Sequence, residues 1–206
     1  PCTGAARPEL EERQGVAPAV RAPATRLRWT TALAVALAYP ALGALGLSLA
    51  IPPGFASPVF PAAGFALACL LIYGPRAAAC VWAGSFLLNL GLVAQSGTFA
   101  ASTVSAAAAV ACGAALQAWL GARWIQAPGD PAWRSLDNER AILRFLLRGG
   151  VLACLASASV AVTALLAAGV LAPGAGAFNW WNWYTGDLIG VVAFARHPAM
   201  FMGLLL

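Results

Sequence analysis

Asp187 is the residue most able to do chemistry, because it is the only acidic side chain inside any of the long apolar stretches of this chain. A carboxylate in a lipid environment costs several kcal/mol unless it is paired, protonated or hydrated, and function is the default interpretation. On a helix, Trp180 lies about one turn before both Trp183 and Tyr184, and Trp183 lies one turn before Asp187, so one stripe joins these aromatics to the acid. Trp181 lies off this stripe. We predict that Asp187, Trp180, Trp183 and Tyr184 form a signal- or ligand-binding site. An aromatic belt at the membrane interface is the alternative for the aromatics.

Two prolines and an asparagine complete the candidate site. Pro58 and Pro61 stand three residues apart at the start of another apolar stretch and make its backbone irregular there. Irregular backbone at membrane depth is tolerated mainly where protein buries it or where it lines a cavity. A proline-rich turn that merely starts a helix is the alternative. Asn89 lies near the end of a third apolar stretch and would reach Asp187 if the two helices touch.

The elements that position these residues must be membrane helices. The chain has 206 residues, of which 61% are hydrophobic and 9% are charged, and its mean hydropathy is +0.79. Soluble domains carry about 25% charged residues. Lipid is therefore the solvent for most of the chain, and backbone groups in lipid must pair internally. We predict an all-α integral membrane helical bundle.

Six apolar runs are long enough to cross a bilayer. The segment before them, 1–28, is polar and is predicted to be a flexible basic cytoplasmic leader, and 29–206 is predicted to form one transmembrane domain, truncated at its C-terminus. The predicted transmembrane helices are 29–51, 57–74, 76–95, 98–122, 149–171 and 178–195.

The arginines set the predicted topology. All twelve basic residues are arginine, and six crossings with a cytoplasmic leader place all of them on the cytoplasmic side. If 57–74 were re-entrant, the five arginines of the loop 123–148 would lie outside, against the positive-inside rule. We therefore expect a multi-pass protein of a bacterial inner membrane with both ends cytoplasmic. Within this loop, 135–147 forms either an interfacial helix or a solvated loop.

Several function classes are excluded or disfavoured. The chain has no lysine, so it has no Walker A motif, no kinase strand lysine and no Schiff-base nucleophile. His197 and the dispersed cysteines do not form a set of metal ligands. The arginines form no patch with interleaved aromatics, which argues against nucleic acid. We predict no catalytic activity for this segment and no metal site. The sequence does not identify a cofactor.

Three motifs together resemble the type-one MASE family, the membrane-associated sensor domains of bacterial histidine kinases and diguanylate cyclases. One is 56–64, which reads Ala-Ser-Pro-Val-Phe-Pro-Ala-Ala-Gly; the second is Gly84 followed by Leu88-Asn89; the third is 180–191, Trp-Trp-Asn-Trp-Tyr-Thr-Gly-Asp-Leu-Ile-Gly-Val. The family's last motif is Trp-Trp-x-Gly-Asp-x-x-Gly-Val followed by proline, which Pro198 would supply. The resemblance covers about 30–200.

This chain departs from the family pattern at Tyr184-Thr185 and at Arg196-His197. The second departure leaves the last helix either ending at Arg196 or continuing toward Leu206. The resemblance implies that the bundle senses a membrane or periplasmic cue and regulates an attached cytoplasmic kinase or cyclase. The implied partners are the lipid bilayer, that output domain, and a second copy or an accessory membrane protein. A small transporter or channel subunit with an intramembrane acid is the alternative.

Overall fold

The computed structural model describes residues 27–50, 57–126 and 139–194, and every regular element in these ranges is a helix. Each of the six predicted segments contains one, which confirms the all-α bundle. The leader and the end of the chain beyond Phe194 lie outside the described residues. The elements are α1 (Trp29–Leu47), α2 (Pro61–Tyr73), α3 (Ala77–Ser96), α4 (Ala101–Ile125), α5 (Glu139–Arg144), the π-helix η2 (Phe145–Leu152), α6 (Ala153–Ala167), the 3₁₀ turn η3 (Pro173–Ala175) and α7 (Gly176–Phe194).

Four of the described helices are long and apolar enough to cross a membrane: Trp29–Leu47, Ala77–Ser96, Ala101–Ile125 and the continuous stretch Glu139–Ala167. α2 is apolar but has 13 residues. α7 has 19 residues, and its first half is rich in tryptophan and asparagine, which lowers its mean hydropathy. By length and composition alone, α2 and α7 are not among the candidate spans, and their crossing of the membrane stays a prediction.

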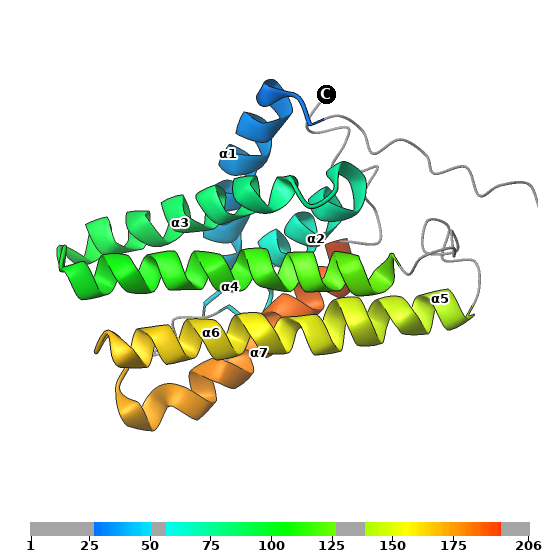
Figure 1. Cartoon of the computed structure of the whole chain (residues 1–206). Coiled ribbons are helices and arrows are strands. Elements are labelled where there is room, and N and C mark those ends of the chain that lie inside the picture. The colour runs from blue at the N-terminus through cyan, green and yellow to red at the C-terminus, as the bar shows by residue number, and fades with distance from the viewer. Residues whose placement is uncertain (1–26, 51–56, 127–138, 195–206) are drawn as a thin grey trace, which may run out of the picture.

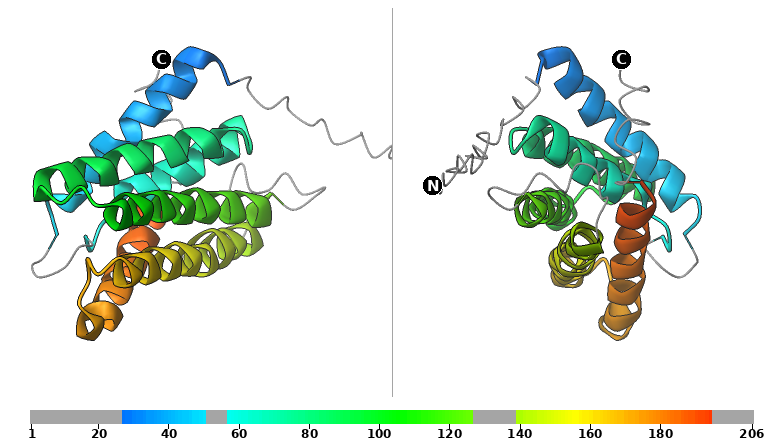
Figure 2. Two further views of the ribbon diagram at one scale, coloured as in Figure 1. Left: turned by 60° about the vertical axis from the view of Figure 1, so that its left-hand side comes forward. Right: turned by 90° about the vertical axis from the view of Figure 1, so that its right-hand side faces the viewer.

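The helix α2 forms the centre of the bundle. Figures 1 and 2 show α3, α4 and the α5–η2–α6 rod side by side, with α1 and α7 crossing them obliquely and α2 between these layers. All residues from Pro61 to Leu70 are buried, and α2 contacts α1, α3, α4 and α7. Its alanines allow neighbouring helices to approach closely. Phe65, Leu67 and Leu70 fill the space between them.

The second predicted span is only partly helical. The helix starts at Pro61, where a proline suits the first helical position because its missing N–H would have no partner there. Thirteen helical residues cover about 20 Å, which is shorter than the roughly 30 Å hydrocarbon thickness of a bilayer, and residues 57–60 before them are not helical.

The fifth predicted span, 149–171, continues a helix that is already formed before it. From Glu139, the first described residue after the gap, the helix continues through η2 into α6, so 139–147 is helical, which agrees with the helical alternative for this segment and not with a solvated loop. Residues 127–138 lie outside the described ranges. Two glycines in η2 allow close packing: a Cβ on Gly149 would lie 2.5 Å from Ile125 Cδ1, and one on Gly150 would lie 2.9 Å from Leu188 Cδ1.

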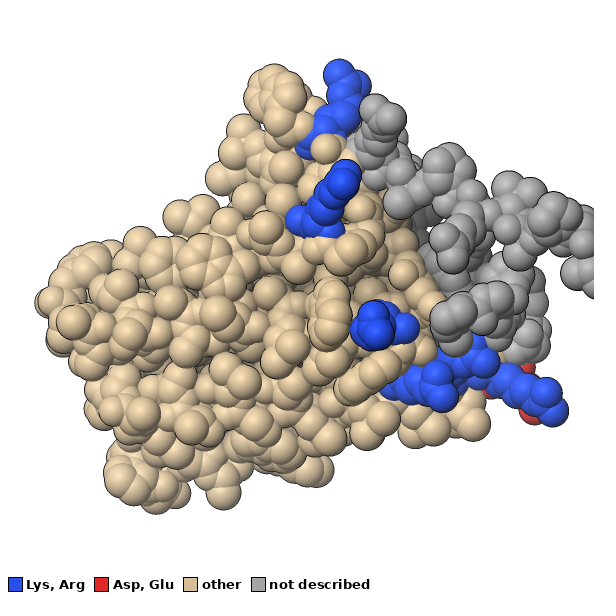
Figure 3. All heavy atoms as spheres, in the orientation of Figure 1, with Lys and Arg blue, Asp and Glu red and all other residues tan. Residues whose placement is uncertain are grey.

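Charge and apolar surface are segregated. Figure 3 shows the described arginines gathered toward one end of the molecule, whereas the opposite end shows no charged side chain on this face. Elsewhere the surface exposes large apolar side chains, as expected for lipid contact, among them Leu33, Leu37, Leu45, Leu87, Leu152 and Ile189. This segregation matches the arrangement that the positive-inside rule requires, and the orientation itself stays a prediction.

Candidate functional site

Asp187 lies deep inside the bundle. It follows the start of α7 at Gly176 by eleven residues, or about 16 Å along the helix axis, and only 2% of its surface is exposed. Ser157, on α6, lines the same cavity as the carboxyl group. One carboxyl oxygen, Oδ2, is buried and has no hydrogen-bond partner among the described residues. A buried carboxylate oxygen without a partner is rare, because its desolvation is not compensated.

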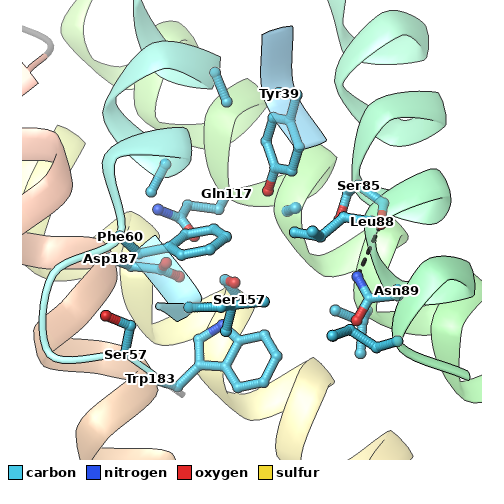
Figure 4. Close-up of a pocket in the computed structure, with 16 residues that line it drawn as sticks. Tyr39, Ser57, Phe60, Ser85, Leu88, Asn89, Gln117, Ser157, Trp183 and Asp187 are labelled. Atoms are coloured by element: carbon cyan, nitrogen blue, oxygen red, sulfur yellow. Dashed lines mark hydrogen bonds between the residues drawn. The ribbon is translucent and has the colours of Figure 1, made fainter. Parts of the chain in front are cut away.

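The carboxyl group faces a cavity of about 40 Å³. One buried water occupies about 10–15 Å³ of such volume, so the cavity has room for on the order of three waters or a comparably small ligand. Figure 4 shows that polar side chains from several helices converge on it. The polar residues of its lining are Tyr39, Ser57, Ser85, Asn89, Gln117, Ser157 and Asp187, and Phe60, Leu88 and Trp183 are among the others.

Three of the predicted site residues share this cavity: Asp187, Trp183 and Asn89. In Figure 4, Asn89 lies across the cavity from Asp187, and its Nδ2 donates to the Ser85 carbonyl oxygen at 2.8 Å. The two helices therefore meet through the cavity and not through a direct hydrogen bond between these two side chains. Trp183 forms part of the wall beside Asp187.

The other predicted aromatics are turned toward α6. The rings of Trp180 and Tyr184 stack with centroids 5.4 Å apart, and the Trp180 indole N–H donates to Ser159 Oγ at 3.2 Å. Neither ring lines the cavity. Trp181, which is off the predicted stripe, is 60% exposed. The aromatic run thus divides between the cavity wall, the contact with α6 and the outer surface.

The proline segment positions its neighbours at the cavity. Pro58 and Pro61 do not line it, but Ser57 and Phe60 do. Ser57 Oγ donates to the Val59 carbonyl at 2.8 Å and accepts from the Val59 N–H at 3.2 Å, which forms a local turn. The Phe60 N–H donates to the carbonyl oxygen of Gly186 at 3.1 Å. This last bond ties the extended segment to α7 next to Asp187.

Two glycines explain the Gly-Asp-x-x-Gly pattern of α7. A Cβ on Gly186 would collide with the Ser57 carbonyl oxygen, and one on Gly190 would collide with the Phe60 carbonyl oxygen. Because glycine has no Cβ, the backbone of 57–60 lies directly against one face of α7. The motifs 56–64 and 180–191 therefore form the two sides of one contact. Asp187 lies between the two glycines in the sequence, next to this contact.

Five polar residues of the cavity were absent from the prediction, namely Tyr39, Ser57, Ser85, Gln117 and Ser157, and all are buried. Gln117 Nε2 contacts Cys154 Sγ at 3.3 Å. Each of these residues is a polar residue inside an otherwise apolar run. Several other polar residues in such runs are exposed, so this sequence pattern identifies the cavity lining only weakly.

Comparison with known families agrees with these motifs. The sequence model of the MASE1 family matches residues 29–198, which include both sides of the contact and every residue of the cavity lining. The chain belongs to the MASE1 family. MASE1 domains are membrane-associated sensor domains of signalling proteins, so the predicted resemblance and its sensor class are confirmed. Comparisons with curated proteins and with solved structures found no match.

The side chains around this MASE1 cavity are suited to hydrogen bonding with a small ligand. The cavity presents a carboxyl oxygen that has no partner among the described residues, several hydroxyl groups and two amides inside a low-dielectric bundle. A hydrogen bond to the ionised form of this group would be stronger than one between neutral groups. A small ligand with a hydrogen-bond donor or a positive charge fits this arrangement best. Within the described ranges, the MASE1 bundle contains no group of three or more side chains placed to hold a metal ion.

Proposed function

We propose that this chain is the signal-input domain of a larger bacterial inner-membrane protein and that the cavity around Asp187 is its sensing site. The domain senses a membrane or periplasmic cue and regulates an attached cytoplasmic histidine kinase or diguanylate cyclase. MASE1 membership supports the sensor class. The observation that carries the sensing site is the buried, unpartnered Oδ2 of Asp187 facing a polar cavity in a membrane-spanning bundle.

An unpartnered carboxylate makes the bundle responsive to what enters the cavity. A hydrogen bond to a charged group contributes about 1.5–3 kcal/mol. A ligand that donates this bond in one conformation and not in the other therefore shifts the equilibrium between them by about 10- to 150-fold. This is the size of a typical coupling between two sites. A signal thus needs no large binding energy to change the output, provided that it discriminates between two states.

The route from the cavity to the output runs along α7. Asp187 lies on this helix, and seven residues separate it from Phe194, the last described residue, which is about 10 Å along the axis. Under the predicted topology, this end of α7 approaches the cytoplasmic side. A change in how α7 packs at the cavity therefore reaches the cytoplasmic end of the same helix without an intermediate element.

The decisive variant is Asp187→Asn in the full-length protein. Asparagine keeps the shape of the side chain but replaces the charged oxygen with a neutral amide that also donates. We expect normal membrane abundance and an output activity fixed in one state, with and without the physiological stimulus. Trp181→Phe is the matched control on the same helix, because Trp181 faces outward; it should respond like wild type.

If Asp187→Asn responds like wild type at equal abundance, the sensing site lies elsewhere. A separate measurement addresses the competing transporter class: the purified protein is reconstituted in liposomes and tested for solute uptake. Uptake that requires Asp187 would contradict the sensor function and would leave the cavity assigned to transport.

A further inference from the structure

A second hollow lies at the arginine-rich end of the bundle, away from the Asp187 cavity. Its volume is about 450 Å³, within the range of about 300–1,000 Å³ that is usual for ligand pockets. The end of α4, the end of α2 and the π-helix η2 form its walls. Its lining is Leu70, Pro75, Trp119, Ala122, Arg123, Trp124, Gln126 and Arg148.

Two guanidinium groups in this hollow have unused donors. Arg148 Nη1 donates to the Trp124 carbonyl oxygen at 3.3 Å, which fixes the side chain at the end of α4. The Arg123 guanidinium lies over the Trp119 ring, 5.6 Å from its centroid. A guanidinium has five N–H donors, and most of these donors have no partner among the described residues. Among the residues that the structure describes, no carboxylate forms an ion pair with either arginine.

Each arginine stands at the end of an exposed apolar stripe. On α4, Trp119 and Leu116 precede Arg123 by four and seven residues and are 39% and 40% exposed. On the neighbouring rod, Leu152 and Leu155 follow Arg148 by four and seven residues and are 48% and 37% exposed. Residues at these spacings share one face of a helix. The hollow is therefore positively charged at the end of the bundle and continues into apolar, lipid-facing surface.

We propose that this hollow binds the headgroup of an anionic phospholipid, with Arg123 and Arg148 contacting its phosphate oxygens. Arginine matches phosphate geometry, and basic pockets between transmembrane helices on the cytoplasmic side are suited to anionic headgroups. The acyl chains follow the stripes that begin at Leu116 and Leu152, and Trp119 and Trp124 lie at the interface, where tryptophan is favoured. A soluble phosphate compound would satisfy the arginines but not the stripes, which favours a lipid. This assignment does not depend on the proposed signalling role.

The test compares lipid preference in wild type and in the double variant Arg123→Gln/Arg148→Gln. The full chain is purified, stripped of lipid and titrated with phosphatidylglycerol or phosphatidylcholine, and bound lipid is counted by native mass spectrometry. We expect the wild type to prefer phosphatidylglycerol and the double variant to lose about 30-fold of that affinity, with phosphatidylcholine unaffected. Arg28→Gln/Arg76→Gln removes the same charge outside the hollow and should keep the preference.

Two further measurements accompany the lipid-binding test. Inorganic phosphate is added as a competitor: full displacement of the lipid at low millimolar concentration would assign the hollow to soluble phosphate and overturn the proposal. In case the double variant fails to insert, wild-type tryptophan fluorescence is measured with acyl-brominated lipids. Brominated phosphatidylglycerol should quench more than brominated phosphatidylcholine, and Trp119→Phe/Trp124→Phe should remove the excess. Equal quenching by both lipids, or equal loss of binding in the control variant, would overturn the proposal.

Discussion

The contact between α7 and the proline segment predicts a large effect for a very small substitution, Gly190→Ala. The added methyl group would collide with the Phe60 carbonyl oxygen, which belongs to the backbone and cannot rotate away. Overpacking of this kind costs about 1–3 kcal/mol. The shift also disturbs the hydrogen bond from the Phe60 N–H to the Gly186 oxygen, which contributes about 0.5–1.5 kcal/mol. The combined cost is about 2–4 kcal/mol.

Gly91→Ala is the matched control. Gly91 also lies inside a helix, α3, but a Cβ there would meet nothing within 4 Å. Both substitutions gain about the same helix propensity, roughly 1 kcal/mol, so this gain cancels when the two variants are compared. Since 1 kcal/mol shifts Tm by about 2–4 °C in a chain of this size, Gly190→Ala should melt roughly 4–16 °C below Gly91→Ala.

The assay is thermal unfolding of the purified chain in detergent, followed by the monodisperse fraction that survives heating. Membrane abundance of both variants is measured in parallel. If Gly190→Ala and Gly91→Ala have the same Tm, then the backbone of 57–60 does not lie against α7 as described. In that case the account of the Gly-Asp-x-x-Gly motif is wrong as well.

Three other predictions follow from the fold and the site. Ser96→Cys should react with a membrane-impermeant thiol reagent in intact cells and Ser135→Cys should not, in a background without the native cysteines; the reverse pattern would invert the topology. Leu67→Ala, at a position that is 1% exposed, should lower the free energy of unfolding by about 2–5 kcal/mol, and a loss below 1 kcal/mol would contradict the central position of α2. Trp180→Phe removes the hydrogen bond to Ser159 and should cost about 0.5–1.5 kcal/mol without changing the response of the output, whereas an altered response would extend the sensing site toward α6.

Apolar run length predicted where helices occur and where most of them start, but not where the second and fifth helices start. α1, α3 and α4 begin within about three residues of the predicted positions, because a membrane helix is specified by its own composition. Whether 57–60 is extended or helical depends instead on a contact with Gly186 and Gly190, more than 120 residues later in the chain. No local pattern contains that information. The helix before the fifth span was left open between two alternatives, because its first turn is charged and apolar run length does not decide there.

The candidate site was predictable where one helix decided the geometry. Trp183 and Asp187 are one turn apart and share the cavity as the stripe required. Trp180 and Tyr184 form a second stripe that is rotated by about 60° on the same helix, since three residues turn an α-helix by about 300°. That rotation directs them to α6. Membrane helices are apolar all round, so periodicity could not show that Gln117 and Ser157 face inward.

The backbone contact of α7 also restricts how this helix can move. An axial shift by one turn, about 5.4 Å, would bring the side chain of Asn182 or Phe194 to a place where a glycine now meets a carbonyl oxygen, and neither side chain fits there. Sliding of α7 by a whole turn along its neighbour is therefore sterically blocked. A tilt about the two glycines would keep them against the carbonyl oxygens, and it would move the opposite ends of α7 in opposite directions.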